Sequence, residues 1–193
     1  MKKYVIATAV AAAAFAPQAF AQAKNFEGFS LAAGLNSVST KMDWSGGATG
    51  SLSGSGTNVG LQAQYAMALG SSFVLGFGVS TTVGEVPVGT PTGGTEVKAK
   101  DLTAVYIAPG FAVSNDVQIY GKIASVNGTV VNATTSDSAS GIGYGVGTQI
   151  LGGKNIYYQI EYLSNKYDDK TNTGGTTTKT STDIFSFSVG YKF

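Results

Sequence analysis

The sequence contains no cysteine, no histidine and no arginine, and each absence excludes a class of chemistry. Without cysteine there is no disulfide framework, no thiol nucleophile and no thiolate metal site. Without histidine the chain lacks the commonest general base and the commonest transition-metal ligand. All twelve basic side chains are lysine, so bidentate guanidinium contacts to phosphate are also excluded. The sequence therefore predicts no cofactor and a protein that is not an enzyme.

Two weaker catalytic or metal-binding arrangements remain open. A Ser-Lys site or a site built on aspartate needs no histidine, whereas a Ser-His arrangement is impossible here. The adjacent Asp168 and Asp169 are capable of attracting a cation. A calcium loop needs more oxygen ligands at defined spacing, so solvated acids are the favoured interpretation and no metal site is predicted.

Charge is scarce in this chain. Charged residues make up 12% of it, about half the usual fraction. Removal of an N-terminal leader that carries Lys2 and Lys3 changes the formal net charge from +1 to −1. This leaves no basic surface that would indicate a nucleic-acid partner. The aromatic residues and the alternating segments described below argue against disorder.

The N-terminus has the pattern of a secretory signal peptide. Lys2 and Lys3 precede an apolar run over residues 5–16, and Ala19 and Ala21 stand at the spacing of an A-x-A cleavage site. The run is too short to span roughly 30 Å of hydrocarbon as a helix.

We therefore predict a cleavable signal peptide over residues 1–21 and a single barrel domain over residues 22–193. Cleavage after Ala23 is the second choice.

The last ten residues have a strict period of two. Large apolar side chains, among them Phe187, Val189, Tyr191 and Phe193, alternate with small or polar ones, and the chain ends on an aromatic residue. This pattern predicts a strand with one apolar face. The last strand of a transmembrane β-barrel closes against the first strand and faces lipid, which explains such a sequence.

Seven earlier segments are also predicted to be strands, and most alternate in the same way. They cover residues 29–36, 58–69, 73–80, 98–112, 117–123, 142–150 and 156–162. Short turns are predicted at 70–72, 114–116 and 152–155, and long loops at 45–58, 82–96, 127–140 and 165–182. The alternation of long loops with short turns is typical of outer-membrane barrels, with the short turns and both termini in the periplasm.

The facing of the segment 98–112 stays ambiguous in the sequence. Leu102, Ala104 and Tyr106 are candidates for the lipid face, yet Val105, Ile107 and Phe111 are equally apolar. Pro109–Gly110 is a candidate bulge at which the facing switches.

The chain resembles a known family in its cleavable leader, in LTAVYIAPGFAVSNDVQIYGKIAS (residues 102–125) and in FSFSVGYKF (residues 185–193). These features are similar to those of small eight-stranded outer-membrane β-barrel proteins, the OmpX-like and opacity-like members of the porin superfamily. The resemblance implies an all-β, eight-stranded, antiparallel, up-and-down transmembrane barrel in the cell outer membrane. It also implies that Phe187, Val189, Tyr191 and Phe193 form the signal read by the barrel-assembly machinery. The family's functions are diverse, so the resemblance implies location and fold but no activity.

Charged residues of the strands are the candidate site. Glu161, Lys122 and Lys192 point inward by parity, and Asp101 does so if Leu102 faces lipid. An eight-stranded barrel is only wide enough for side chains to fill it, so these charges are expected to pair across the lumen. The alternative is that they line a conducting path.

Two further features have more than one interpretation. The run GIGYGVG (residues 141–147) resembles a nucleotide-binding loop, but no helix follows it, so Gly143, Gly145 and Gly147 are predicted to make room for Tyr120 and Tyr157. The only tryptophan, Trp44, lies in the first predicted loop, either as an adhesive contact or as an anchor at the outer interface.

The sequence thus favours an outer-membrane barrel with a structural or surface-interaction role and a packed polar lumen. A small passive pore and a soluble periplasmic ligand-binding barrel are the alternatives. The expected partners are outer-membrane lipid and lipopolysaccharide, the assembly machinery during biogenesis, and an unknown extracellular partner that contacts the long loops.

Overall fold

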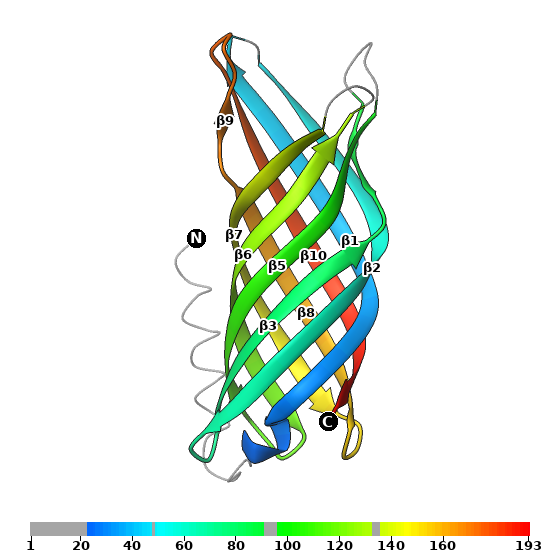
Figure 1. Ribbon diagram of the computed structural model, residues 1–193, viewed down its shortest axis with the longest axis vertical. Helices are drawn as coiled ribbons and strands as arrows, with labels where there is room; N and C mark the ends of the chain where they lie inside the picture. The colour runs from blue at the N-terminus through cyan, green and yellow to red at the C-terminus, as the bar shows by residue number, and fades with distance from the viewer. Residues whose placement is uncertain (1–22, 48, 91–95, 133–135) are drawn as a thin grey trace, which may run out of the picture.

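The computed structural model describes residues 23–47, 49–90, 96–132 and 136–193 and arranges them as one antiparallel sheet rolled into a barrel (Figure 1). The eight long strands are β1 (Gly28–Gly46), β2 (Gly50–Leu69), β3 (Phe73–Val83), β5 (Val97–Ala112), β6 (Val117–Val131), β7 (Ser136–Leu151), β8 (Ile156–Tyr167) and β10 (Thr176–Lys192). The short elements are η1 (Ala23–Phe26), β4 (Val86–Gly89) and β9 (Lys170–Thr171). The barrel closes because β10 pairs with β1. The predicted eight-stranded up-and-down barrel is confirmed.

Two findings concern helices and the N-terminus. The predicted signal peptide, residues 1–21, lies outside the described residues. Within the described ranges, no helix is long and apolar enough to cross a membrane.

Large apolar side chains form a belt around the outside of the barrel. The belt consists of Phe29, Leu31, Leu35, Val59, Leu61, Tyr65, Phe73, Phe77, Val79, Val105, Ile107, Phe111, Ile119, Ile123, Ile142, Tyr144, Val146, Ile150, Ile156, Tyr158, Ile160, Tyr162, Phe185, Phe187, Val189, Tyr191 and Phe193, together with Leu69 and Val83 at its edges. Period-two alternation places one such side chain at about every second position, as predicted. A water-soluble ligand-binding barrel would point these side chains inward, so that alternative is wrong.

Strand β5 settles the ambiguous facing. Its outward side chains are Val105, Ile107 and Phe111, and its inward ones are Leu102, Ala104 and Tyr106. The pairing of β5 with β6 shifts register between Lys100 and Thr103, where Asp101 adopts a φ of 54°. Above this bulge Ala99 points inward, so the facing switches at Asp101. The predicted switch at Pro109–Gly110 was therefore placed wrongly.

The four predicted long loops were also wrong, because strands occupy most of residues 45–58, 127–140 and 165–182, and the end of β3 and all of β4 lie within residues 82–96. Strand β1 has 19 residues, whereas a strand needs about 9–11 to cross a membrane. The strands continue because neighbouring strands of the barrel supply the ladder hydrogen bonds beyond the belt, where water replaces lipid on the outside. Beyond the belt, small polar residues occupy both faces of the strands, so the sequence no longer alternates between apolar and polar residues. The strand prediction relied on that alternation.

We call the described residues above the belt the collar. They are residues 38–58, 84–102, 127–141 and 163–183. For β1 the collar adds roughly 20–25 Å along the barrel axis, from about 3.3 Å per residue and a tilt near 40°. Its outward face on β1 and β2 carries hydroxyl side chains, including Ser39, Ser51, Ser53 and Ser55. This outward face of the collar is therefore suited to contact with water and with polar molecules at the cell surface.

Candidate functional site

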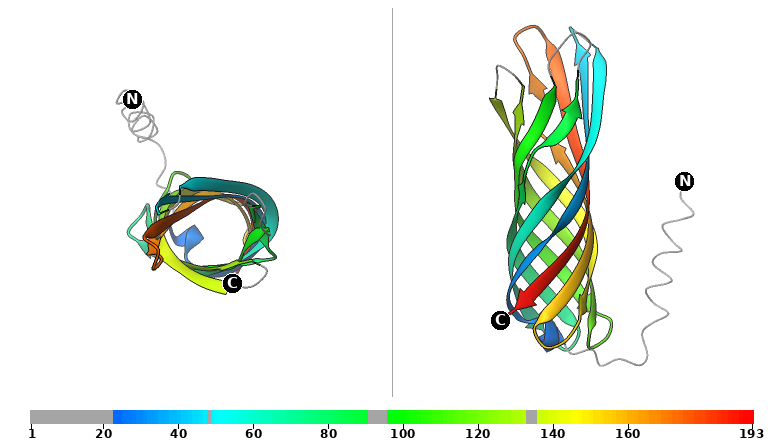
Figure 2. Two further views of the ribbon diagram at one scale, coloured as in Figure 1. Left: turned by 90° about the horizontal axis from the view of Figure 1, so that it is seen from above. Right: turned by 90° about the vertical axis from the view of Figure 1, so that its right-hand side faces the viewer.

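The lower end of the lumen is closed by η1. Viewed along the axis, this turn lies within the ring of strands (Figure 2). The Ala23 N–H donates to the carbonyl oxygen of Ser71 at 2.9 Å, which ties the turn to the β2–β3 connection. Phe26 and Ala23 are buried in an apolar cluster with Ala66, Val74 and Ala112. The first described residues of the chain therefore seal the end at which the short turns lie.

The upper end is closed by β4. Val86 and Val88 are both 0% exposed. Val86 packs with Val38, Leu163 and Ile184, and Val88 packs with Ala99 and Leu102. Gly54 and Gly56 of β2 allow this close approach, because a Cβ on Gly54 would stand 2.3 Å from the Pro87 carbonyl oxygen. The sequence analysis placed these residues in a loop and missed the plug, although the alternation in Val86-Pro87-Val88 was a signal for it.

Lys122 and Glu161 form an ion pair in the middle of the lumen. The Lys122 Nζ and the Glu161 Oε2 are 2.5 Å apart, and the two residues are only 3% and 6% exposed. The Tyr120 hydroxyl donates to the same carboxylate oxygen at 2.8 Å. The Lys122 ammonium also lies 4.0 Å from the centre of the Tyr106 ring, within cation–π range. Both charges are thus neutralised by partners from other strands.

A layer of amides continues the network across the lumen. Gln62 and Gln159 are joined by two amide hydrogen bonds of 3.4 Å, and Gln159 also donates to Glu161. The Tyr106 hydroxyl donates to Gln64 at 3.1 Å. β2, β5, β6 and β8 are therefore cross-linked through their inward faces.

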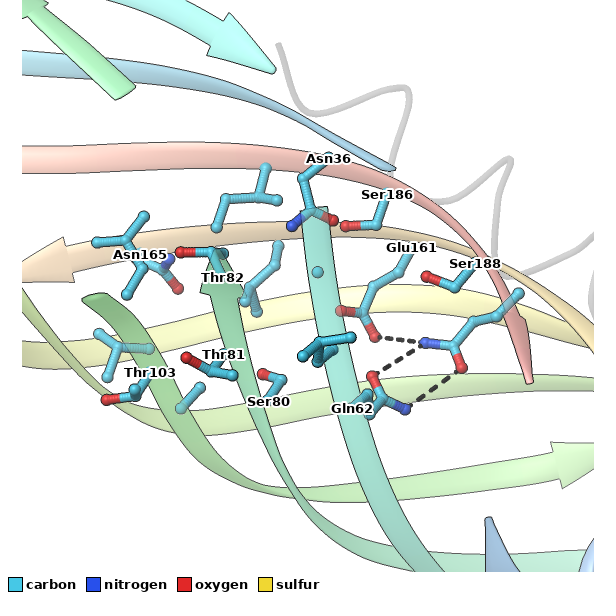
Figure 3. A pocket seen from close by; sticks show the side chains of 18 of the residues that line it. Asn36, Gln62, Ser80, Thr81, Thr82, Thr103, Glu161, Asn165, Ser186 and Ser188 are labelled. Atoms are coloured by element: carbon cyan, nitrogen blue, oxygen red, sulfur yellow. Dashed lines mark hydrogen bonds between the residues drawn. The ribbon is translucent and has the colours of Figure 1, made fainter. Parts of the chain in front are cut away.

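A cavity of about 60 Å³, lined by both polar and apolar side chains, lies between the ion-pair layer and the upper plug. Figure 3 shows Asn36, Glu161 and Ser186 directed toward this space from β1, β8 and β10. Leu163 and Ile184 bound it on the side of β4. A space of this volume and polarity accommodates several water molecules. In the described residues, this cavity therefore lies between η1 and the ion-pair layer on one side and β4 on the other.

Glycines that face tyrosine rings leave space for those rings inside the lumen. A Cβ on Gly147 would stand 2.3 Å from the Tyr120 hydroxyl oxygen, which confirms the predicted role of this glycine. Tyr157 lies instead over Gly190 of β10, where a Cβ would come within 2.1 Å of the ring. The sequence could not show which glycine faces which ring, because that depends on register between strands.

The other two predicted lumen charges do not join the central pair. Lys192 points inward at the lower end, where its ammonium donates to the carbonyl oxygen of Asn25 in η1. Asp101 is exposed at the bulge of β5. Its inward placement required Leu102 to face lipid, and Leu102 faces the lumen.

The acidic pair of the fourth predicted loop, Asp168 and Asp169, is exposed in the collar. Asp169 accepts an ion pair from Lys179 at 3.5 Å, and both side chains are largely exposed. Within residues 23–47, 49–90, 96–132 and 136–193, no three metal-binding side chains come together.

Trp44 lies near the top of the collar, far above the belt. A Cβ on Gly50 would stand 2.7 Å from its indole Nε1, so the ring covers that glycine. Strand parity puts the ring on the inner side of β1, together with Met42 and Val38. Its height excludes the interpretation as an anchor at the outer interface.

The four residues of the predicted assembly signal face outward. Phe187, Val189, Tyr191 and Phe193 belong to the belt on β10. The Phe193 ring lies 5.7 Å from that of Phe29 on β1 and 5.0 Å from that of Tyr191. These contacts lie on the seam where the last strand meets the first.

The barrel fold described above agrees with a match between this sequence and a known protein family. Residues 6–193 match the family described as outer membrane protein beta-barrel domain. The chain belongs to this family. As a member of it, the protein resides in the cell outer membrane, with the belt in lipid. No curated protein sequence matches the chain.

Solved structures of family-like barrels share the fold. The attachment invasion locus protein Ail of Yersinia pestis, in complex with the heparin analogue sucrose octasulfate, superimposes with a TM-score of 0.61 at 17% identity. The match covers 86% of this chain and 99% of Ail. OprG of Pseudomonas aeruginosa matches with a TM-score of 0.53 at 15% identity, over 91% of this chain and 99% of OprG. At these identities the likeness establishes the fold alone.

Proposed function

We propose that this outer-membrane barrel is a surface-interaction protein with a structural role, that it acts through its collar, and that its lumen does not conduct. The observation that carries this proposal is the closure of the lumen by the chain itself. η1 seals one end, β4 seals the other, and the Lys122–Glu161 pair crosses the middle. An interior filled in this way stabilises the barrel, and the part left to meet other molecules is the collar.

The collar is suited to hydrogen bonding more than to charge attraction. Its described residues include six lysines and eight carboxylates. Three of its six lysines form ion pairs, as in the Lys41–Asp43 pair at 2.8 Å and the Lys98–Glu85 pair at 3.1 Å. The polyanion held in the Ail structure therefore has no matching basic surface here. Binding through this collar should depend only weakly on salt.

The remaining partners follow from the family. Lipid and lipopolysaccharide surround the belt and the base of the collar. Phe187, Val189, Tyr191 and Phe193 would present the outward aromatic strand to the barrel-assembly machinery, and residues 1–21 would be removed on export.

Trimming the collar tests the proposal. Replacement of residues 43–51 and of residues 169–178 by Asn-Gly should leave a folded barrel, because both cuts lie above the buried pair Asn165 and Thr182. Adhesion of bacteria that express the chain to basement-membrane extract or to glass should fall at least fivefold. The same replacement of residues 152–155 on the opposite end is the matched control and should change nothing. A heat-dependent shift in gel mobility verifies folding. Equal adhesion of trimmed and intact protein would refute a role of the collar.

A small passive pore is the second candidate. The cavity, which has Glu161 in its lining, favours a pore, since a modest rearrangement of β4 would connect the cavity to the extracellular side. This function predicts steady channels in planar bilayers that Glu161→Gln abolishes.

A further inference from the structure

The outer surface of the collar on three neighbouring strands is covered with hydroxyl groups. In the collar β1 pairs with β10 on one side and with β2 on the other, so the three strands form one continuous surface. Every second side chain of each strand points outward. The outward positions are Ser37, Ser39, Lys41, Asp43 and Ser45 on β1, Ser51, Ser53, Ser55 and Thr57 on β2, and Thr177, Lys179, Ser181 and Asp183 on β10. We call this surface the hydroxyl face, because nine of its thirteen side chains end in a hydroxyl.

The hydroxyl face offers side chains to a partner, and not the main chain of β1. Between Ser37 and Trp44, β1 is bonded on both sides, so its N–H and C=O groups are used within the barrel. The hydroxyls stand in facing pairs, such as Ser37 beside Thr57 and Ser39 beside Ser55. Facing side chains lie about 5 Å apart, and successive outward ones on a strand lie about 6.7 Å apart. The face is therefore a regular array of groups that both donate and accept hydrogen bonds.

The charged side chains of the hydroxyl face cancel one another. Lys41 pairs with Asp43 at 2.8 Å, and Lys179 pairs with Asp169 of the neighbouring hairpin at 3.5 Å. The Asp183 carboxylate accepts a hydrogen bond of 2.9 Å from a tyrosine hydroxyl of β8. The face itself carries two lysines and two aspartates, so its formal charge is zero. A charged polymer therefore finds no matching field on this surface.

The composition of the hydroxyl face also identifies the chemistry of a partner. The centres of protein interfaces are enriched in aromatic residues, methionine and arginine, and they are depleted in serine, lysine and aspartate. The face has none of the enriched residue types and consists of the depleted ones together with threonine. It also stands above the apolar belt, so it does not meet lipid tails. An uncharged polysaccharide fits, because its surface consists of hydroxyls that donate and accept as those of serine do.

We propose that the hydroxyl face binds an extended, uncharged polysaccharide from outside the cell. This inference rests on the proposed surface-interaction role and gives that role a binding surface and a partner chemistry. Each hydrogen bond to a hydroxyl adds little to the affinity, so binding requires several sugar units that lie along the face at once. Because the ligand makes no ion pairs, its affinity is nearly independent of salt.

Cellohexaose, six β-linked glucose units, serves as the probe, with an uncharged fluorescent label and the full mature protein in nanodiscs. Fluorescence anisotropy should show saturable binding that changes less than twofold between low and high salt. A heparin hexasaccharide with the same label should bind at least tenfold more weakly, because it is a polyanion. Ser39→Ala with Ser51→Ala, Ser53→Ala and Ser55→Ala should weaken the binding of cellohexaose at least tenfold, because four hydroxyls are lost while the backbone ladder is kept.

The matched control removes four outward hydroxyls from the other side of the barrel. Thr103→Ala with Ser125→Ala, Ser138→Ala and Ser140→Ala changes β5, β6 and β7 in the same way, and this variant should bind cellohexaose within twofold of the original protein. A heat-dependent shift in gel mobility verifies that both variants fold.

A modified sugar makes the test independent of protein folding. Methylation of every hydroxyl of cellohexaose keeps the chain and removes its donors, so binding should be lost. Binding of the methylated sugar, equal binding by both alanine variants, tighter binding of heparin, or no binding of cellohexaose by the original protein would each overturn the proposal. If adhesion still depends on the collar in those cases, the partner chemistry is wrong while the proposed function stands.

Discussion

Lys122→Met is expected to lower the free energy of unfolding by about 3–5 kcal/mol, because it leaves the Glu161 carboxylate buried without its cation. The Tyr120 hydroxyl and the Gln159 amide still donate to that carboxylate, but neither neutralises its charge. Urea unfolding of the protein in lipid vesicles, followed by tryptophan fluorescence and gel mobility, measures the loss.

Two variants separate the buried pair from a general effect of losing a lysine. Lys122→Met combined with Glu161→Gln removes both charges and keeps an acceptor for Tyr120, so it should recover most of the loss. Lys41→Met breaks the exposed pair with Asp43 and should change the unfolding free energy by less than about 1 kcal/mol. If the double variant is as unstable as Lys122→Met, the loss does not come from an unpaired charge.

The second large expected loss of stability tests where the lipid-facing belt ends and the collar begins. Phe187→Arg places a charge on the lipid face near the middle of β10, and it should cost about 2–4 kcal/mol in the same unfolding measurement. Thr177→Arg is the matched control, since Thr177 has the same parity on the same strand but pairs with the uncharged Ser45 and Thr171 in the collar. It should cost close to nothing. Equal costs for both substitutions would mean that lipid covers the collar and that the boundary is misplaced.

The sequence predicted the part of the barrel that meets lipid. There the outward face must be apolar and the inward face small or polar, so the parity of Ile142, Tyr158 and Phe187 could be assigned without neighbours. The same parity placed Lys122, Glu161 and Tyr120 on the inside, where they meet.

The sequence could not predict what depends on register or on water. In the collar both faces are polar, so residues 45–58 resembled a loop although partner strands hold them extended. The bulge at Asp101 was missed because nothing local marks it, whereas Pro109 was a conspicuous but wrong candidate. The closure by Val86 and Val88 depends on Gly54 and Gly56, thirty residues away in the chain, and only the fold shows that approach.

The most direct test of the central claim is the steady conductance of the purified mature protein in planar lipid bilayers. With η1, the Lys122–Glu161 pair and β4 in place, the bilayer should stay at its baseline current. Reproducible open channels that disappear in Glu161→Gln would contradict a closed lumen and assign the protein as a pore.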